Sequence, residues 1–284
     1  MKKAIVIIGP TASGKTKYAI NLAKELDGEI INFDSLQIYK DLKILTAHPS
    51  EEDQNLIKHK LFGYRNYNEK TDAASWARLA AAAINETFAE KKIPILTGGT
   101  GFYINTLING ISYLPQISEE NRTKAIELSK TNYEQLCSIV YQNSESLKEI
   151  ITRDKHRQMI RAYEVLIETG KSILEFFKEP KKKFISNVNF EIHLMKIDRD
   201  ELYKRIEIRF ENMLKNGAIE EVQNLIKKIG ENNINNFPIF NAIGAKEILL
   251  YLTRSYCLEQ MKKLACIRAR HYAKRQITWL NHQL

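Results

Sequence analysis

The segment that most constrains this chain is GPTASGKT, at residues 9–16. It follows the apolar run AIVII and precedes the helical pattern KYAINLAKEL. A strand, a glycine-bounded loop and a helix N-terminus together form a cradle of backbone N–H groups that binds phosphate. Gly9 and Gly14 permit a close turn, Lys15 brings a cation to phosphate oxygens, and the Thr16 hydroxyl is a Mg²⁺ ligand. The segment therefore predicts binding of a diphosphate or triphosphate, with ATP as the first expectation.

Strand and helix patterns alternate over the first hundred residues. We predict apolar strands at 28–33 and 93–97 and an alanine-rich helix at 73–91. Continuously apolar strands that alternate with helices indicate a parallel sheet covered on both faces. Ligands of such sheets bind outside the carboxyl ends of the strands. Asp34 and the glycine-rich turn at 98–101 each follow a predicted strand, so we expect both to lie beside the phosphate loop.

The chain changes character after Pro115. Residues 118–178 are polar and helical in pattern, without a clear strand. Within them, 157–168 (RQMIRAYEVLIE) reads as an amphipathic helix that ends at Thr169 and Gly170. We therefore predict an all-helical insertion in an α/β fold.

The segment after the insertion returns to the α/β pattern. A last strand candidate lies at 190–198, with a pattern that suits a return to the sheet. Helices are predicted beyond it, at 201–215, 218–228, 245–252 and 258–280. The predicted fold is a P-loop NTPase-like parallel sheet flanked by helices, formed by residues 1–114 and 187–284, with the helical insertion at 115–186.

Charge points to a polyanionic partner. The 284 residues carry a net charge of +9, which favours nucleic acid but also fits a basic solvated surface.

The cysteines, at 137, 257 and 266, form no CxxC pair, so neither a zinc site nor a disulfide framework is supported. No apolar stretch approaches the length of a membrane span. We expect a cytoplasmic protein that does not engage membranes.

Two polar residues at predicted strand ends have alternative interpretations. Asp34 is either the N-cap of a following helix or a carboxylate that faces bound phosphates. In the second case it holds Mg²⁺ or accepts a proton from a nucleophile. Thr100 is either part of a tight turn or a donor to a phosphate oxygen. Position beside the phosphate loop favours the functional interpretation of both.

Two groups of basic residues lie near the C-terminus. Arg205 and Arg209 share a helix face, either in surface salt bridges or over a departing diphosphate. The segment 260–284 contains no acid, so we expect its uncompensated cations to bind a phosphate backbone. Tyr272 and Trp279 interleave with these cations and would either stack on bases or cover the core. Trp279 is expected to belong to the core. The cations are Lys262, Lys263, Arg268, Arg270, Lys274 and Arg275.

Five ordered blocks resemble one enzyme family. GPTASGKT, DSLQIY, PILTGGTGFYI, RQMIRAYEV with TGK, and YAKRQITW are similar to blocks of the bacterial tRNA dimethylallyltransferases, also called tRNA isopentenyltransferases. The matching blocks run from Ala4 to about Leu280. The resemblance implies transfer of a dimethylallyl group from dimethylallyl diphosphate to N6 of adenosine 37. That base lies in the anticodon loop of tRNAs that read codons beginning with U. Diphosphate is released with the help of Mg²⁺, and the enzyme is a monomer.

The resemblance also implies roles for individual residues. Asp34 takes the proton from the adenine amine or forms a hydrogen bond with it, Thr100 lies at the reacting centre, and Arg205 or Arg209 contacts the diphosphate. Thr16 binds the metal. The diphosphate loop comprises Gly9, Pro10, Thr11, Ala12, Ser13, Gly14, Lys15 and Thr16. The expected tRNA contacts are Asp34, Ser35, Leu36, Gln37, Arg122, Gln158, Met159, Ile160, Arg161, Ala162, Lys274, Arg275 and Gln276.

Three other functions share parts of this pattern. A dimethylallyltransferase that acts on free AMP or ADP has the same fold, but the helical insertion and the basic C-terminal helix favour tRNA. A small-molecule kinase shares the loop and the aspartate after the second strand. A nucleotide-gated RNA-binding module is the third alternative.

Overall fold

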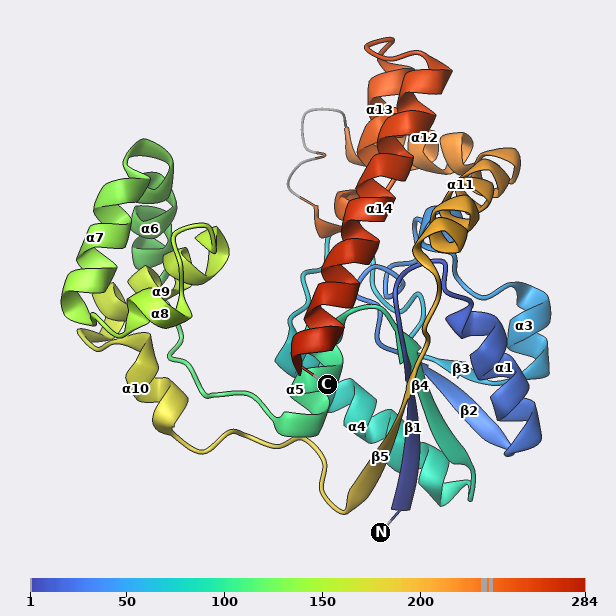
Figure 1. Cartoon of the computed structure of the whole chain (residues 1–284), viewed down its shortest axis with the longest axis horizontal. Helices are drawn as coiled ribbons and strands as arrows, with labels where there is room; N and C mark the ends of the chain where they lie inside the picture. The colour runs from blue at the N-terminus through green and yellow to red at the C-terminus, as the bar shows by residue number, and fades with distance from the viewer. Residues whose placement is uncertain (1, 231–233, 235–236, 284) are drawn as a thin grey trace. The chain divides into compact units, whose positions relative to one another are not determined.

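The computed structural model of this chain describes residues 2–230, 234 and 237–283 (Figure 1). The chain divides into two compact units. Unit 1 comprises Met1–Ile108 and Phe184–Leu284, and unit 2 comprises Asn109–Lys183. The phosphate loop and the sheet both belong to unit 1.

A five-stranded sheet in the order β3-β2-β4-β1-β5 forms the centre of unit 1, and all its pairings are parallel. The predicted parallel sheet is therefore confirmed. The strands are β1 (Lys2–Ile8), β2 (Gly28–Asn32), β3 (His59–Lys60), β4 (Ile93–Gly98) and β5 (Val188–Leu194). Because β2, β4 and β1 are neighbours, the loops that follow them emerge side by side.

Strand β5 is the candidate expected at 190–198, and it pairs with β1 from Lys2↔Val188 to Ile8↔Leu194. It ends four residues earlier than predicted. Asp198 lies outside the strand because its carboxylate accepts hydrogen bonds from the backbone N–H groups of Asp200 and Glu201 and so caps the next helix.

Helices cover both faces of the sheet. Helix α1 packs on the face that carries Ile5, Ile7 and Ile95, whereas α4, α5 and the end of α14 cover the face that carries Val6 and Leu96. The helix α5 was not predicted, since only a glycine-rich turn was expected there. The helices outside unit 2 are α1 (Lys15–Glu25), α2 (Lys43–Thr46), α3 (Glu51–Leu56), α4 (Ala73–Ala89), α5 (Gly101–Asn109), α11 (Arg199–Lys215), α12 (Ala218–Ile229), η2 (Pro238–Asn241), α13 (Ala245–Leu252) and α14 (Leu258–Gln283).

A second core lies above the carboxyl ends of the strands. Ile38, Leu42 and Leu45, from the segment after β2, pack against apolar residues of α11 to α14. Figure 1 shows α14 running from α13 down to α5 beside the sheet. The C-terminal helices are thereby held over the strand ends where the phosphate loop lies.

Unit 2 consists of helices around its own core, as predicted for this segment. Helix α9 ends at Gly170, whose φ of 70° is the left-handed conformation expected of a C-terminal glycine. The helices are α6 (Glu119–Thr131), α7 (Tyr133–Asn143), α8 (Leu147–Ile150), α9 (His156–Thr169) and α10 (Ile173–Lys178). Across the described residues of both units, no helix combines the length and apolar character that a membrane crossing requires.

Two histidines of unit 1 flank Phe62. The rings of His48 and His59 meet it edge-on, with centroids 5.9 and 5.5 Å away. The Nε2 atoms of both histidines are buried without a hydrogen-bond partner among the described residues. Burial, and secondarily the Lys43 cation, lowers the pKa of His48 from 6.5 to about 4. The folded state therefore favours the neutral ring.

The free energy of unfolding is expected to fall as the pH drops from 6.5 towards 4, because the unfolded chain then binds a proton at residue 48 that the folded chain resists. The loss from His48 approaches about 3 kcal/mol below pH 4. Urea unfolding at pH 7, 5.5 and 4 would measure it, with His48→Gln showing a shallower decline. His271→Gln, at an exposed position, is the matched control, and an equal decline in both variants would contradict the expectation.

Candidate functional site

The phosphate loop joins β1 to α1 and leaves the helix N-terminus open. Gly14 occupies the N-cap with a φ of 90°, a conformation that favours glycine, and no side chain caps the helix. The hydroxyl of Ser13 is buried without a hydrogen-bond partner among the described residues. Lys15 Nζ donates to the carbonyl oxygens of Gly9 and Pro10, at 3.0 and 2.7 Å. Unused backbone donors, an unpaired hydroxyl and a cation are thus gathered at the start of α1, an arrangement that suits an anion.

Two cations without a carboxylate partner lie at this loop. Burial, followed by the charge of Arg209, lowers the pKa of Lys15 to about 7. Burial likewise lowers the pKa of Arg209, and neither side chain forms an ion pair with an acid of the described residues. Two neighbouring cations that are withdrawn from water on one side are costly unless an anion joins them. The electrostatics therefore favour a bound phosphate group.

The two arginines of α11 that the sequence left as alternatives make different contacts. Arg209 Nη1 donates to Thr11 Oγ1 of the phosphate loop at 3.4 Å. Arg205 is exposed and its Nε donates to Glu201 at 2.8 Å, four residues earlier on the same helix. Arg209 is thus hydrogen-bonded to the phosphate loop. Arg205 Nη1 lies near the same loop, 3.7 Å from where a Cβ on Gly14 would stand, but its Nε is engaged in the surface salt bridge of the alternative interpretation.

Asp34 follows β2 and holds a tight turn. Its Oδ1 accepts a hydrogen bond from the backbone N–H of Leu36 at 2.9 Å, and its own N–H donates to Asn32 at 2.8 Å. No helix begins here, so the N-cap interpretation is wrong. Oδ2 accepts no hydrogen bond from the described residues. The negative charge of Asp34 also affects the phosphate loop. It raises the pKa values of Lys15 and Arg209 and so partly offsets the lowering caused by burial.

Thr100 links the turn after β4 to the segment after β2. Its Oγ1 accepts from the backbone N–H of Ser35 at 2.9 Å and lies 3.2 Å from the Ser35 hydroxyl, to which it donates. The predicted meeting of three strand ends is confirmed. The phosphate loop, Asp34 and Thr100 follow β1, β2 and β4, which are adjacent in the sheet.

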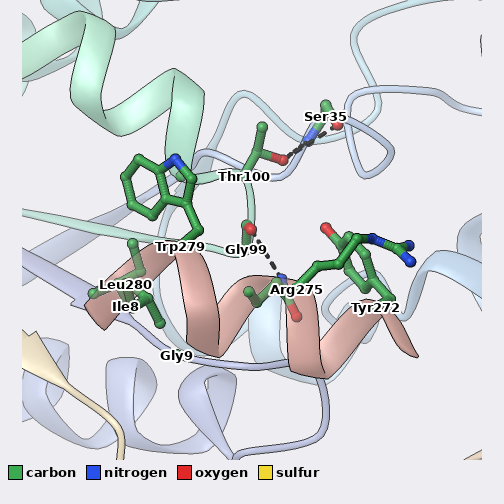
Figure 2. Close-up of a pocket in the computed structure, with 11 residues that line it drawn as sticks. Ile8, Gly9, Ser35, Gly99, Thr100, Tyr272, Arg275, Trp279 and Leu280 are labelled. Carbon is green, nitrogen blue, oxygen red and sulfur yellow. Dashed lines mark hydrogen bonds between the residues drawn. The ribbon is translucent and has the colours of Figure 1, made fainter. Parts of the chain in front are cut away.

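A pocket of about 280 Å³ lies beside these groups (Figure 2). Figure 2 shows Trp279, Leu280 and Ile8 on one side, with Tyr272 and Arg275 on the other. Trp279 therefore packs at the edge of the core, as expected, and also lines the pocket. The lining residues are Ile8, Gly9, Ser35, Gly99, Thr100, Gly101, Tyr272, Arg275, Gln276, Trp279 and Leu280.

The other residues expected to contact tRNA fall into different environments. Gln37 donates through Nε2 to the backbone oxygens of Thr46 and Ala47, and Leu36 packs at the edge of the second core. In unit 2, Arg122 and Gln158 are exposed, and Arg161 is half-buried beside Glu164. Met159 and Ala162 are buried in the core of unit 2, with Ile160 packed against them. These three side chains therefore hold unit 2 together.

The expectation of an uncompensated basic helix is only partly right. Acids of neighbouring helices pair with half of its cations: Lys262 with Glu211, Arg268 with Glu247, and Arg270 with Glu207. Lys263, Lys274 and Arg275 form no ion pair within the described part of the chain. The missing acids of this helix are thus supplied by α11 and α13, and three cations remain for an external anion.

Comparisons with known proteins agree over the whole chain. The sequence profile of the IPP transferase family matches residues 37–283. The tRNA dimethylallyltransferase of Rickettsia bellii (strain OSU 85-389) is 39% identical over 284 residues, which cover 100% of this chain and 89% of that protein. The tRNA dimethylallyltransferase of Pelagibacter ubique is 38% identical over 283 residues, covering 98% and 88%.

Solved structures give the same result. A eukaryotic dimethylallyltransferase acting on tRNA superposes with a TM-score of 0.83 and 28% identity, covering 99% of this chain and 70% of that one. The tRNA isopentenylpyrophosphate transferase of Bacillus halodurans superposes with a TM-score of 0.68 and 30% identity, covering 99% and 88%. The resemblance seen in five sequence blocks is therefore confirmed.

Proposed function

We propose, from the fact that this chain belongs to the IPP transferase family, that it transfers a dimethylallyl group to N6 of adenosine 37 in the tRNA anticodon loop. Dimethylallyl diphosphate is the donor, and the tRNAs are those that read codons beginning with U. The observation that carries the proposal is the junction of a cation-lined phosphate loop with the Asp34 carboxylate at neighbouring strand ends. The phosphate loop suits a diphosphate, and the Asp34 carboxylate suits an amine that must lose a proton.

The donor side stabilises the leaving group. As the bond between C1 of the dimethylallyl group and the diphosphate oxygen breaks, its electron pair passes to that oxygen. Lys15, Arg209 and the open amides at the start of α1 are placed to neutralise the growing charge. Fixed cations in a partly buried site are most effective at this moment of the reaction.

The acceptor side activates the adenine amine. N6 forms the new bond to C1, and its proton passes to Asp34, whose Oδ2 is unengaged among the described residues. An exocyclic amine is a weak nucleophile, so alignment and a proton acceptor both matter. The base must leave its stack to react. The pocket beside Thr100, with its apolar side at Trp279 and Leu280, is the proposed receptor for it.

Magnesium fits this site as an ion shared with the substrate. The described residues contain no group of three or more His, Cys, Asp or Glu side chains able to hold a metal. Mg²⁺ commonly binds through few protein ligands plus substrate phosphates. Thr16, exposed in the first turn of α1, would hold it together with diphosphate oxygens, and the bound ion would add positive charge beside the leaving group.

The proposed tRNA contacts are mostly exposed polar side chains. In unit 2 they are the exposed Arg122 and Gln158 together with Arg161, which is half-buried and paired with Glu164. In α14 they are Lys274 and Arg275, which are both exposed. Such contacts would fix the backbone of the anticodon loop and offset the cost of unstacking the base. Since unit 1 alone holds the donor and acceptor groups, we propose a monomer, located in the cytoplasm with its tRNA substrate.

Donor binding is expected to take up a proton. At pH 8 Lys15 is mostly neutral because its pKa is about 7, and a neighbouring diphosphate favours its charged form. Dimethylallyl diphosphate should therefore take up about one proton per site at pH 8 and much less at pH 6. Titration calorimetry in buffers of different ionisation enthalpy measures this. Lys15→Met should abolish the uptake, whereas Lys17→Met, at an exposed position of the same helix, should retain it.

The function is tested by mass spectrometry of modified nucleosides. The purified protein is incubated with dimethylallyl diphosphate, Mg²⁺ and total tRNA from a strain that lacks the modification, and digests are examined for N6-dimethylallyladenosine. A parallel reaction offers AMP. Product in tRNA alone supports the proposal, whereas labelled AMP with unmodified tRNA would assign the chain to the AMP-directed enzymes.

A further inference from the structure

One buried side chain connects the phosphate loop to the turn after β4. Gln276 of α14 is 8% exposed. Its Oε1 accepts a hydrogen bond from the backbone N–H of Thr11 at 2.8 Å, and its Nε2 donates to the carbonyl oxygen of Gly99 at 2.9 Å. The dashed line at Gly99 in Figure 2 marks the second bond. Thr11 belongs to the phosphate loop and Gly99 to the turn after β4, so a single amide bridges the two.

The turn after β4 is shaped to receive this helix. A Cβ on Gly99 would overlap Gln276 Nε2, and a Cβ on Gly101 would overlap the ring of Trp279. Gln276 and Trp279 are three residues apart, so they share a face of α14. The helix is thereby seated against two glycines, with Thr100 held between them.

Both partners of the Gln276 amide are connected to residues that take part in the proposed reaction. On the donor side, Thr11 receives a hydrogen bond from Arg209. On the acceptor side, Gly99 precedes Thr100, which holds the backbone of Ser35 next to Asp34. The amide of Gln276 therefore connects the diphosphate side of the site to the side that holds the proton acceptor.

We propose that Gln276 is a positioning residue that fixes the phosphate loop relative to the turn after β4, with its amide engaged by Thr11 and Gly99 and not by the tRNA backbone. This inference rests on the proposed function and revises the role that the family resemblance implied for this residue. Glutamine suits the task because it accepts at one end and donates at the other. A carboxylate in its place would still accept from Thr11 but would face the Gly99 oxygen without a proton to donate.

The test compares Gln276→Glu with the wild type in single-turnover transfer at saturating tRNA and dimethylallyl diphosphate. At pH 8 we expect the variant to be slower by about tenfold or more, since a buried acceptor is left against a carboxylate. As the pH is lowered to 6, protonation restores the missing donor, so the deficit should shrink. The dissociation constant for tRNA should stay within about twofold of wild type. Lys274→Gln, two residues away, should instead weaken tRNA binding.

The outcomes separate the possible roles. Equal transfer rates at every pH, or weaker tRNA binding with an unchanged rate at saturation, would overturn the positioning role and leave the proposed function intact. A deficit of the same size at all pH values, accompanied by a lowered melting temperature, would indicate general damage and also overturn it. If the wild type modifies no tRNA, the proposed function fails and this inference fails with it.

Discussion

Replacement of Asp34 by asparagine is expected to slow dimethylallyl transfer by about 10²- to 10⁴-fold, the usual contribution of a positioned general base. Asparagine keeps the oxygen that accepts the hydrogen bond from Leu36, so the turn after β2 is retained. It loses the second carboxylate oxygen and the negative charge, and with them the ability to take a proton from the adenine amine. The expected loss is therefore in the transfer step and not in the fold.

Single-turnover transfer from radiolabelled dimethylallyl diphosphate measures this loss, and filter binding measures tRNA affinity. Asp34→Ala serves as the comparison, because it also removes the turn hydrogen bond and should lower the melting temperature in addition to the rate. An Asp34→Asn enzyme with more than about a third of wild-type activity would rule out proton acceptance by this residue. That result would not contradict the proposed roles of the phosphate loop and of the tRNA contacts.

Replacement of Arg209 by glutamine is expected to lower transfer by about 10²- to 10³-fold, comparable to the loss of a donor that stabilises transition-state charge. The arginine is partly buried beside Lys15 and contacts the phosphate loop through Thr11. Its removal withdraws one of the two cations that face the diphosphate. The KM for dimethylallyl diphosphate should also rise, while tRNA affinity should stay near its wild-type value.

Arg205→Gln is the matched comparison, since it changes the same residue type one helical turn away. Arg205 is exposed and already paired with Glu201, so its loss should cost far less than the loss of Arg209. Steady-state kinetics with each substrate varied in turn distinguish the two. If the Arg205 variant were the more impaired, the assignment of the diphosphate contact to Arg209 would be wrong.

The sheet and the meeting of its loops could be predicted from sequence because both depend on local signals. The apolar strands, the glycine-bounded loop and Asp34 can each be recognised from a few neighbouring residues. The rule for parallel sheets then predicts that the segments after these strands lie close together. The same local reasoning separates core from surface in α9. The spacing of Met159 and Ala162 by three residues marks a buried face, which argues against external contacts for those two side chains.

Contacts between distant segments could not be predicted. Gln276 accepts a hydrogen bond from Thr11, which lies 265 positions away in the sequence, and no local pattern predicts such a contact. The ion pairs of α14 escaped prediction for the same reason, since the acids come from α11 and α13. The choice between Arg205 and Arg209 likewise required the path of α11 over the phosphate loop, because both arginines share one face of that helix.

The pairing of β1 with β5 has a consequence for how the enzyme is made. Strand β1, which leads into the phosphate loop, is synthesised before unit 2, yet its partner β5 follows the whole of unit 2 in the chain. The two join in register over all seven residues of β1. Contacts so distant in sequence form late and fold slowly. The donor site is therefore completed only after unit 2 has been synthesised, and nascent chains that stop short of β5 expose one edge of β1 to aggregation.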